Sequence, residues 1–206
     1  MEKIYNYIRL ALKDTFYESF EFDIEKYSEH FINAIEEVRY DCNIKYFNKL
    51  KVNNTKDILT LVKIDSTIEA VFLYRLERSI YLKDSSNQLL PFLASLMRRR
   101  TNCEIYYSTK IGRGLNIQHG FGIVIGPRFE IGENFIIHQG VTLGQKNLNS
   151  PDEKIIIGDN VTLFANSTIL GNIKIASGTV VGANSVLLSD TEKNSVYVGV
   201  PAKRIR

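Results

Sequence analysis

The chain has 206 residues, enough for one domain or two small ones, and its 26 lysines and arginines barely exceed its 23 aspartates and glutamates, for a net charge of +3. This excess is too small to indicate a nucleic-acid partner. No stretch approaches the roughly eighteen consecutive apolar residues of a membrane span, and the N-terminus lacks the apolar core of a signal peptide, so we expect a cytoplasmic protein. Cys42 and Cys103 lie far apart without the spacing of a metal site or a disulfide framework, which predicts two free thiols and no bound metal.

The first hundred residues have the apolar spacing of amphipathic helices. Apolar side chains recur three and four residues apart in three sets: Ile4, Ile8, Ala11 and Leu12; Tyr27, Phe31, Ala34, Ile35 and Val38; and Ile68, Val71, Phe72, Leu76 and Ile80. The polar stretches 53–54 and 83–88 are predicted connectors, and Pro91 is expected to open a last helix that ends near Arg100. Residues 1–100 are therefore predicted to form an α-helical domain.

The second half of the chain has a period of six instead. Aliphatic side chains recur at this spacing in two runs: Ile125, Ile131, Ile137 and Leu143, then Ile157, Leu163, Ile169, Ile175, Val181 and Leu187. An earlier run shows the same period two residues out of register: Ile105, Ile111, Ile117 and Ile123. A fixed short period is typical of a solenoid, because each side chain stacks against its counterpart on the next coil. Residues 101–206 are therefore predicted to form a parallel β-helix, so the fold class is α + β.

Five segments of this region resemble the catalytic half of bacterial serine acetyltransferases. They are IGRGLNIQHGFGIVIG (111–126), QGVTLG (139–144), ILGNIKI (169–175), VGANSVLL (181–188) and GVPAKRIR (199–206). The resemblance implies a left-handed parallel β-helix of hexapeptide repeats that uses acetyl-CoA as co-substrate. It also implies homotrimers with active sites between neighbouring coils, and the helical domain could join two trimers into a dimer of trimers.

His119 is the predicted catalytic base. It precedes Gly120-Phe121-Gly122, where the spacing between anchors lengthens from six residues to eight, from Ile117 to Ile125. Glycines allow the backbone to leave the regular coil there, which makes the imidazole available for chemistry. Acetyl transfer from a thioester to a hydroxyl needs a base for the hydroxyl proton, and imidazole titrates near neutral pH. The resemblance places the family's general base at the same position.

Glu104 and His138 are candidates for roles beside His119. Glu104 corresponds to the acidic residue that pairs with the histidine in the family, and a carboxylate there would fix the imidazole tautomer and stabilise the imidazolium. The alternative for Glu104 is a solvent-facing glutamate on the first coil. His138 follows an inward-facing anchor, so contact with the acceptor, contact with a second subunit and plain packing all fit its position.

The resemblance also indicates residues that would line the acetyl-CoA cleft. Gly144 would allow close approach to its backbone, and Ala165 and Ala183 match small residues of that cleft. Lys203 and Arg204 would face the nucleotide phosphates. Simpler explanations are a glycine turn, alanines in a tight corner and a solvated basic pair.

Residues 145–154 interrupt the period and are predicted to protrude as a loop, where specificity often lies. In serine acetyltransferases this loop carries an arginine and a histidine that hold the amino acid's carboxylate, whereas here it carries Asp152 and Glu153. Gln118 likewise stands where many members have an acidic residue that suits the ammonium of serine. Because these neutral and acidic side chains suit hydroxyl groups, the predicted acceptor is a sugar of a capsule or lipopolysaccharide.

Two alternatives stay open. L-Serine is the alternative acceptor, since Lys146 or Lys154 could supply the missing positive charge. A catalytically inactive β-helix that serves as a scaffold is the alternative from another class, although the presence of His119 in its glycine-rich corner argues against it.

Overall fold

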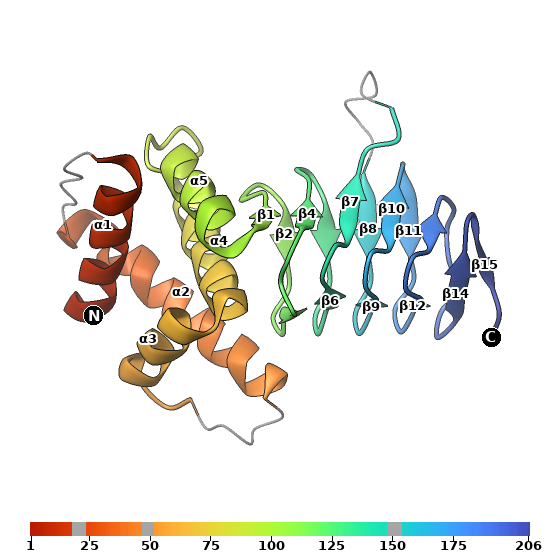
Figure 1. Cartoon of the computed structure of the whole chain (residues 1–206), viewed down its shortest axis with the longest axis horizontal. Helices are drawn as coiled ribbons and strands as arrows, with labels where there is room; N and C mark the ends of the chain where they lie inside the picture. The colour runs from red at the N-terminus through yellow and green to blue at the C-terminus, as the bar shows by residue number, and fades with distance from the viewer. Residues whose placement is uncertain (18–23, 47–51, 148–153) are drawn as a thin grey trace. The chain divides into compact units, whose positions relative to one another are not determined.

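The computed structural model describes residues 1–17, 24–46, 52–147 and 154–206. The chain divides into two compact units, Met1–Thr101 and Asn102–Arg206. The first unit consists of helices and the second of short strands wound into coils, as the labels in Figure 1 show. The predicted fold class, a helical part followed by a left-handed parallel β-helix, is confirmed.

Five helices form the first unit: α1 (Glu2–Phe16), α2 (Ile24–Lys45), α3 (Thr55–Ile64), α4 (Ser66–Lys83) and α5 (Leu90–Thr101). The three sets of regularly spaced apolar residues lie on α1, α2 and α4, and every member except Tyr27 is buried. Burial of an aliphatic or aromatic side chain stabilises a fold by about 1.5–3 kcal/mol, so these faces hold the helices together.

Helix α3 was not predicted. It begins directly after Asn54, which the sequence indicated only as part of a connector. The Asn54 side chain caps the helix by accepting hydrogen bonds from the backbone N–H groups of Lys56 at 2.9 Å and Asp57 at 3.1 Å. With ten residues the helix is too short for a clear period, although all of its apolar side chains except the exposed Ile64 are buried.

Helix α4 also buries charge. Arg75 donates from Nε to Asp41 Oδ2 at 2.9 Å and from a terminal nitrogen to Asp41 Oδ1 at 3.1 Å, and both side chains are almost fully buried. Two parallel hydrogen bonds offset much of the desolvation cost of such a pair. Glu77, on the same helix, is buried without a hydrogen-bond partner among the described residues.

Three sheets run along the second unit. Sheet A contains β1 (Cys103–Ile105), β4 (Ile123–Ile125), β7 (Thr142–Gly144), β10 (Thr168–Leu170) and β13 (Val186–Leu187). Sheet B contains β2 (Lys110–Ile111), β5 (Glu130–Ile131), β8 (Ile155–Ile157) and β11 (Ile173–Ile175). Sheet C contains β3 (Asn116–Gln118), β6 (Ile136–His138), β9 (Thr162–Leu163), β12 (Val180–Val181), β14 (Val196–Gly199) and β15 (Ala202–Arg204).

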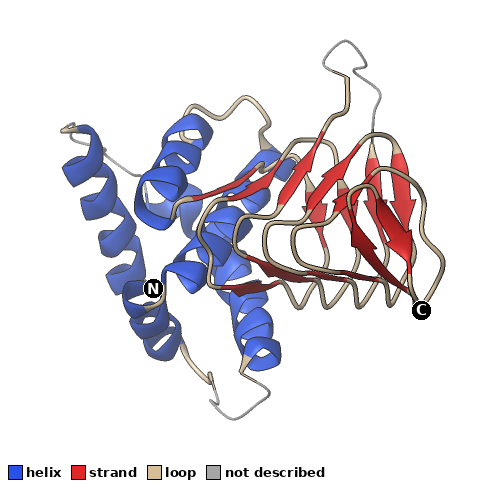
Figure 2. Cartoon of the chain, turned by 45° about the vertical axis from the view of Figure 1, so that its right-hand side comes forward, coloured by secondary structure: helices blue, strands red, loops and turns tan. Residues whose placement is uncertain are grey.

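Each of the first four coils contributes one strand to each sheet in turn, and the last coil contributes β13 to sheet A and β14 to sheet C. Neighbouring strands are parallel except for the antiparallel pair β14 and β15. Figure 2 shows these strands in red, aligned on successive turns of the chain. The anchors with a period of six point inward and stack in register, as Ile125 does on Leu143 in sheet A and Ile137 on Leu163 in sheet C. This register explains the period, because an anchor must recur wherever a coil passes from one sheet to the next.

A search of the described residues for a helix long and apolar enough to cross a membrane found none.

Candidate active site

The corner that carries His119 is longer than its counterpart on the next coil. Gln118 pairs with His138, and Val124 pairs with Thr142, so residues 119–123 fill the same place as residues 139–141. The two additional residues explain why the first run of anchors is out of register with the second. His119 itself has a φ of 65° in the left-handed region. Such a conformation costs a non-glycine residue roughly 1–3 kcal/mol and is typical of functional sites.

Contacts on both sides hold this corner. The thiol of the buried Cys103 donates to the carbonyl oxygen of Gly120, and the backbone N–H of Gly122 donates to the carbonyl oxygen of Asn102 at 2.9 Å. On the side of the next coil, Gly140 N–H donates to the carbonyl oxygen of Phe121 at 2.7 Å. The backbone is therefore fixed while the His119 side chain stays exposed. Cys103 was predicted only as a free thiol; it is free of a disulfide but has this additional contact.

His138 lies beside His119 and stacks on a phenylalanine. The ring centroids of His119 and His138 are 6.4 Å apart, and the rings of His138 and Phe164 stack at 4.8 Å with an interplanar angle of 29°. Burial lowers the pKa of His138, and the positive charge that His119 can carry lowers this pKa further. The second imidazole is therefore a neutral hydrogen-bonding group near pH 7.

Gln118 and Glu104 flank the same corner. The side-chain amide of Gln118 donates to Asn116 Oδ1 at 2.8 Å, which fixes its orientation along β3. Glu104 is partly exposed on β1, next to Cys103, and pairs in register with Val124. Strand β1 and the His119 corner are thus in direct contact, and the pairing of the Glu104 carboxylate with the His119 imidazole stays a prediction.

Ala165 and Ala183 lie on the edge that also carries His119. We call this the C–A edge, the set of corners that lead from sheet C to sheet A (residues 119–122, 139–141, 165–167 and 183–185). Backbone N–H groups join these corners, from Asn166 to the carbonyl of Gln139 and from Asn184 to the carbonyl of Ala165, both at 2.9 Å. The base and both small residues therefore occupy one continuous column.

The other residues predicted for acetyl-CoA lie elsewhere. Gly144 ends β7 at the opposite end of the sheet A strands, and its carbonyl accepts a hydrogen bond from Gly171 N–H at 3.4 Å. Lys203 and Arg204 lie on β15, where Arg204 forms an ion pair with Glu192. Within one chain, the structure does not bring these three residues together with the alanines of the C–A edge.

Two predicted substrate contacts, Asp152 and Glu153, lie outside the described residues.

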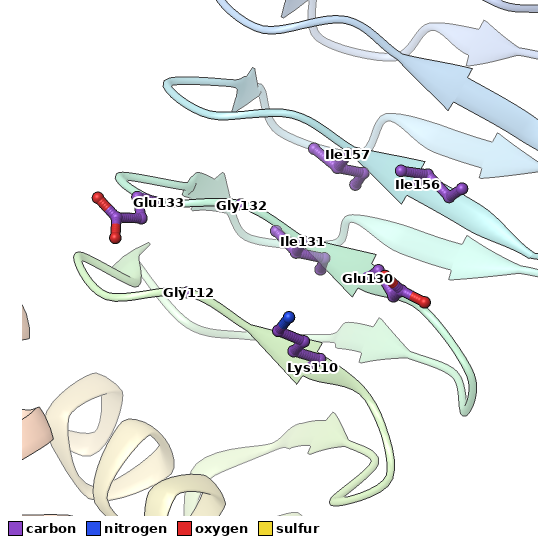
Figure 3. Close-up of a pocket in the computed structure, with 8 residues that line it drawn as sticks. All are labelled: Lys110, Gly112, Glu130, Ile131, Gly132, Glu133, Ile156 and Ile157. Atoms are coloured by element: carbon purple, nitrogen blue, oxygen red, sulfur yellow. The ribbon is translucent and has the colours of Figure 1, made fainter.

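A hollow of about 340 Å³ opens on sheet B, away from the C–A edge. It is lined by Lys110, Gly112, Glu130, Ile131, Gly132, Glu133, Ile156 and Ile157. Figure 3 shows Lys110, Glu130 and Glu133 around it with their charged groups well separated. None of the predicted site residues lines it, so it does not identify the site. No group of three or more potential metal ligands is found among the described residues.

Sequence reasoning missed Phe164, which stacks on His138, and Gln139, whose side-chain oxygen is buried on the C–A edge. The available signal for Phe164 was its place directly after the anchor Leu163, which matches the place of His138 after Ile137. The interruption of the period at 145–154 obscures this correspondence in the sequence.

Comparisons with known proteins agree with this architecture. Residues 154–189 match the family described as bacterial transferase hexapeptide (six repeats). The serine acetyltransferase of Staphylococcus epidermidis is 35% identical over 176 residues, which cover 84% of this chain and 79% of that protein.

Solved structures give the same result. The serine acetyltransferase of Neisseria gonorrhoeae superposes with a TM-score of 0.74 and 31% identity, covering 85% of this chain and 67% of that one. The serine acetyltransferase of Brucella abortus in complex with coenzyme A gives a TM-score of 0.74 and 26% identity, covering 88% of this chain and 71% of that one.

Proposed function

The chain belongs to the serine acetyltransferase family, and from this membership we propose that it transfers the acetyl group of acetyl-CoA to the hydroxyl of L-serine. The enzyme class is that of an acetyl-CoA-dependent O-acetyltransferase, with acetyl-CoA as co-substrate. One observation carries the proposal: the alignment with a serine acetyltransferase covers 84% of the chain. The aligned part includes the His119 corner with its two additional residues.

The comparisons support L-serine better than the sugar that the sequence favoured. The sugar prediction depended on Gln118, Asp152 and Glu153, and the last two lie outside the described residues. The relatives above are serine acetyltransferases, and they match most of the chain rather than the repeats alone. One feature favours a sugar: the exposed ring of Phe164 beside His138, since an aromatic face suits the apolar face of a sugar ring.

We propose that His119 is the general base of the reaction. Its imidazole takes the proton from the acceptor hydroxyl as the oxygen attacks the thioester carbonyl carbon. The tetrahedral intermediate then collapses, the carbon–sulfur bond breaks, and the proton passes from the imidazolium to the departing CoA thiolate. The exposed position of His119 on a fixed corner supports this role, since a base must reach substrate from a defined place.

The positions of the residues near His119 suggest supporting roles for them in the reaction. We propose that Glu104 stabilises the imidazolium from β1, and that Gln118 and His138 contact the acceptor from the ends of β3 and β6. Ala165 and Ala183 are proposed to leave room for acetyl-CoA along the C–A edge. Gly144 and Lys203 remain proposed cofactor contacts, although within one chain they lie apart from these alanines. Arg204 is the weakest member of this set, because Glu192 already neutralises it.

We further propose a homotrimer. The outward-facing residues of sheet C form a half-buried ladder in register, Ile136, Thr162, Val180 and Val196, which suits contact with a second copy. Pairing of two trimers through the helical unit, whose Leu10 and Ile32 are exposed, would give a dimer of trimers. Because acetyl-CoA is made inside the cell, the proposed location is the cytoplasm.

The test is release of CoA thiol from acetyl-CoA, followed with a thiol-reactive dye, with L-serine and a panel of capsule and lipopolysaccharide sugars as acceptors. Turnover with L-serine that is lost in His119→Asn supports the proposal. Turnover with a sugar but not with L-serine would overturn the acceptor and keep the enzyme class.

A further inference from the structure

The side-chain oxygen of Gln139 is buried without a hydrogen-bond partner among the described residues. Leaving a buried acceptor unpaired is costly, and nearly all such groups in native proteins are paired. An unpaired oxygen on the edge that carries the proposed base is therefore a candidate acceptor for a hydrogen bond from a bound ligand.

The position of Gln139 narrows the choice of ligand group. His138, the preceding residue, has its ring 6.4 Å from that of His119, and Gly140, the following residue, donates to Phe121 in the His119 corner at 2.7 Å. The backbone carbonyl of Gln139 accepts from Asn166 N–H, directly after Ala165. Gln139 thus lies in the column between the proposed base and the alanines proposed for acetyl-CoA.

The neighbouring Gln118 differs from Gln139, because its side-chain amide has a hydrogen-bond partner within the protein. Gln118 lies one coil away, and its amide is held by Asn116 Oδ1 at 2.8 Å. Of the two glutamines beside the proposed base, Gln118 thus has its side-chain nitrogen bonded within the protein, and Gln139 has a buried side-chain oxygen without a partner among the described residues.

The chemistry of acetyl-CoA supplies a matching donor. Its thioester sulfur is followed by an ethylene group and then by an amide N–H. Reaction requires the thioester carbonyl near the base, with reacting atoms about 3–3.5 Å apart. The amide N–H then lies on the C–A edge between His119 and Ala165, one coil from His119. Gln139 occupies this position.

We propose that Gln139 is a positioning residue for acetyl-CoA, whose side-chain oxygen accepts a hydrogen bond from the amide N–H nearest the thioester. This inference rests on the proposed placement of His119 as base and of acetyl-CoA along the C–A edge, and it is independent of the acceptor. The bond aligns the thioester with the base and satisfies an oxygen that the protein leaves unpaired.

The test removes the two partners of the proposed hydrogen bond separately: the amide N–H of the thioester compound and the side-chain oxygen of Gln139. S-acetyl-N-acetylcysteamine carries this amide N–H, and its analogue with an ester oxygen in place of the N–H does not. Wild type should favour the amide compound about tenfold in kcat/KM, whereas Gln139→Met should favour it little or not at all. Gln139→Glu, which retains an acceptor oxygen, should restore the preference. Gln118→Met is the matched control and should keep the preference even if its KM for the acceptor changes.

The inference would be overturned if Gln139→Met favoured the amide compound over the ester analogue as strongly as wild type does. It would also be overturned if Gln139→Met raised only the KM for the acceptor. A fall in the melting temperature of Gln139→Met with the preference kept would assign the residue a structural role instead. If L-serine fails as acceptor, the same ratio is measured on thioester hydrolysis, so that failure of the proposed acceptor is distinct from failure of the Gln139 inference. Calorimetric titration with CoA, expected to bind about tenfold more weakly to Gln139→Met, provides a readout that needs no turnover.

Discussion

The thiol of Cys103 donates a hydrogen bond to the backbone carbonyl oxygen of Gly120, the residue that follows His119. Cys103 is buried at the start of β1, and Gly120 is buried in the corner one coil later. The contact therefore joins the first strand of the coil to the backbone of the proposed base, and it satisfies a carbonyl group that has left the regular pairing of the sheets.

Cys103→Ala should weaken this corner. Loss of the thiol leaves the carbonyl of Gly120 buried and unpaired, which is expected to lower the free energy of unfolding by about 1–3 kcal/mol. Because the corner orients His119, kcat should fall while the KM for acetyl-CoA changes little. Cys103→Ser retains a donor and should keep more of both properties. Urea unfolding and steady-state kinetics on the two variants provide the comparison; an alanine variant as stable and active as wild type would exclude this role for Cys103.

His119→Asn should separate catalysis from folding. Asparagine tolerates the left-handed conformation that His119 adopts with its φ of 65°, so the corner should keep its shape. Without the imidazole, the rate of acetyl transfer is expected to fall by a factor of about 100 to 10,000. Thiol release measures the rate, and circular dichroism melting tests the fold. Wild-type turnover by this variant would remove His119 from the mechanism.

Much of the fold can be predicted from the local spacing of apolar residues, because this spacing determines which side chains are buried. The helical spacing of Ile4, Phe31 and Phe72 places them in the core, and the period of six places the anchors inside the coil. The eight-residue gap between Ile117 and Ile125 even predicts the longer corner at His119.

Contacts between coils were less predictable. The stacking of His138 on Phe164 joins residues between which the period of the sequence is interrupted, and the partner of the Cys103 thiol lies one full coil away. Such contacts depend on the register between coils, which the spacing of anchors alone does not specify across a loop. The sugar acceptor was predicted largely from the side chains at 145–154, and the comparisons support L-serine better.

Glycines at the stacked corners should differ sharply in their tolerance of a methyl group. A Cβ on Gly132 would lie 2.8 Å from the carbonyl carbon of Gly158 and 2.9 Å from the backbone nitrogen of Asp159, so the coils would have to separate. Gly132→Ala is therefore expected to lower the free energy of unfolding by about 1–3 kcal/mol.

Gly144→Ala is the matched control for this effect. Among the residues that the structure describes, its Cβ would meet the Leu170 side chain at 3.3 Å and the Thr142 side chain at 3.8 Å but no backbone atom, so the variant should melt close to wild type. If Gly144 also lines the acetyl-CoA cleft as proposed, the same variant should raise the KM for acetyl-CoA. Equal loss of stability in both variants would contradict the steric argument.

Glu77 should make the stability of the helical unit fall as pH rises. Burial raises the pKa of Glu77 well above its ordinary value, and the charge of Arg98 opposes this increase only in part. Since the unfolded chain ionises this carboxyl near its ordinary pKa of 4.5, folding then favours the protonated form, and its contribution to stability is lost as pH rises above that value. Glu77→Gln removes the ionisation while keeping the shape of the side chain. The variant should therefore resemble wild type near pH 4 and become more stable than wild type toward pH 8, by at most about 1.4 kcal/mol for each pH unit. Urea unfolding across this range measures the difference; two parallel pH profiles would show that Glu77 is ionised and paired in the folded protein.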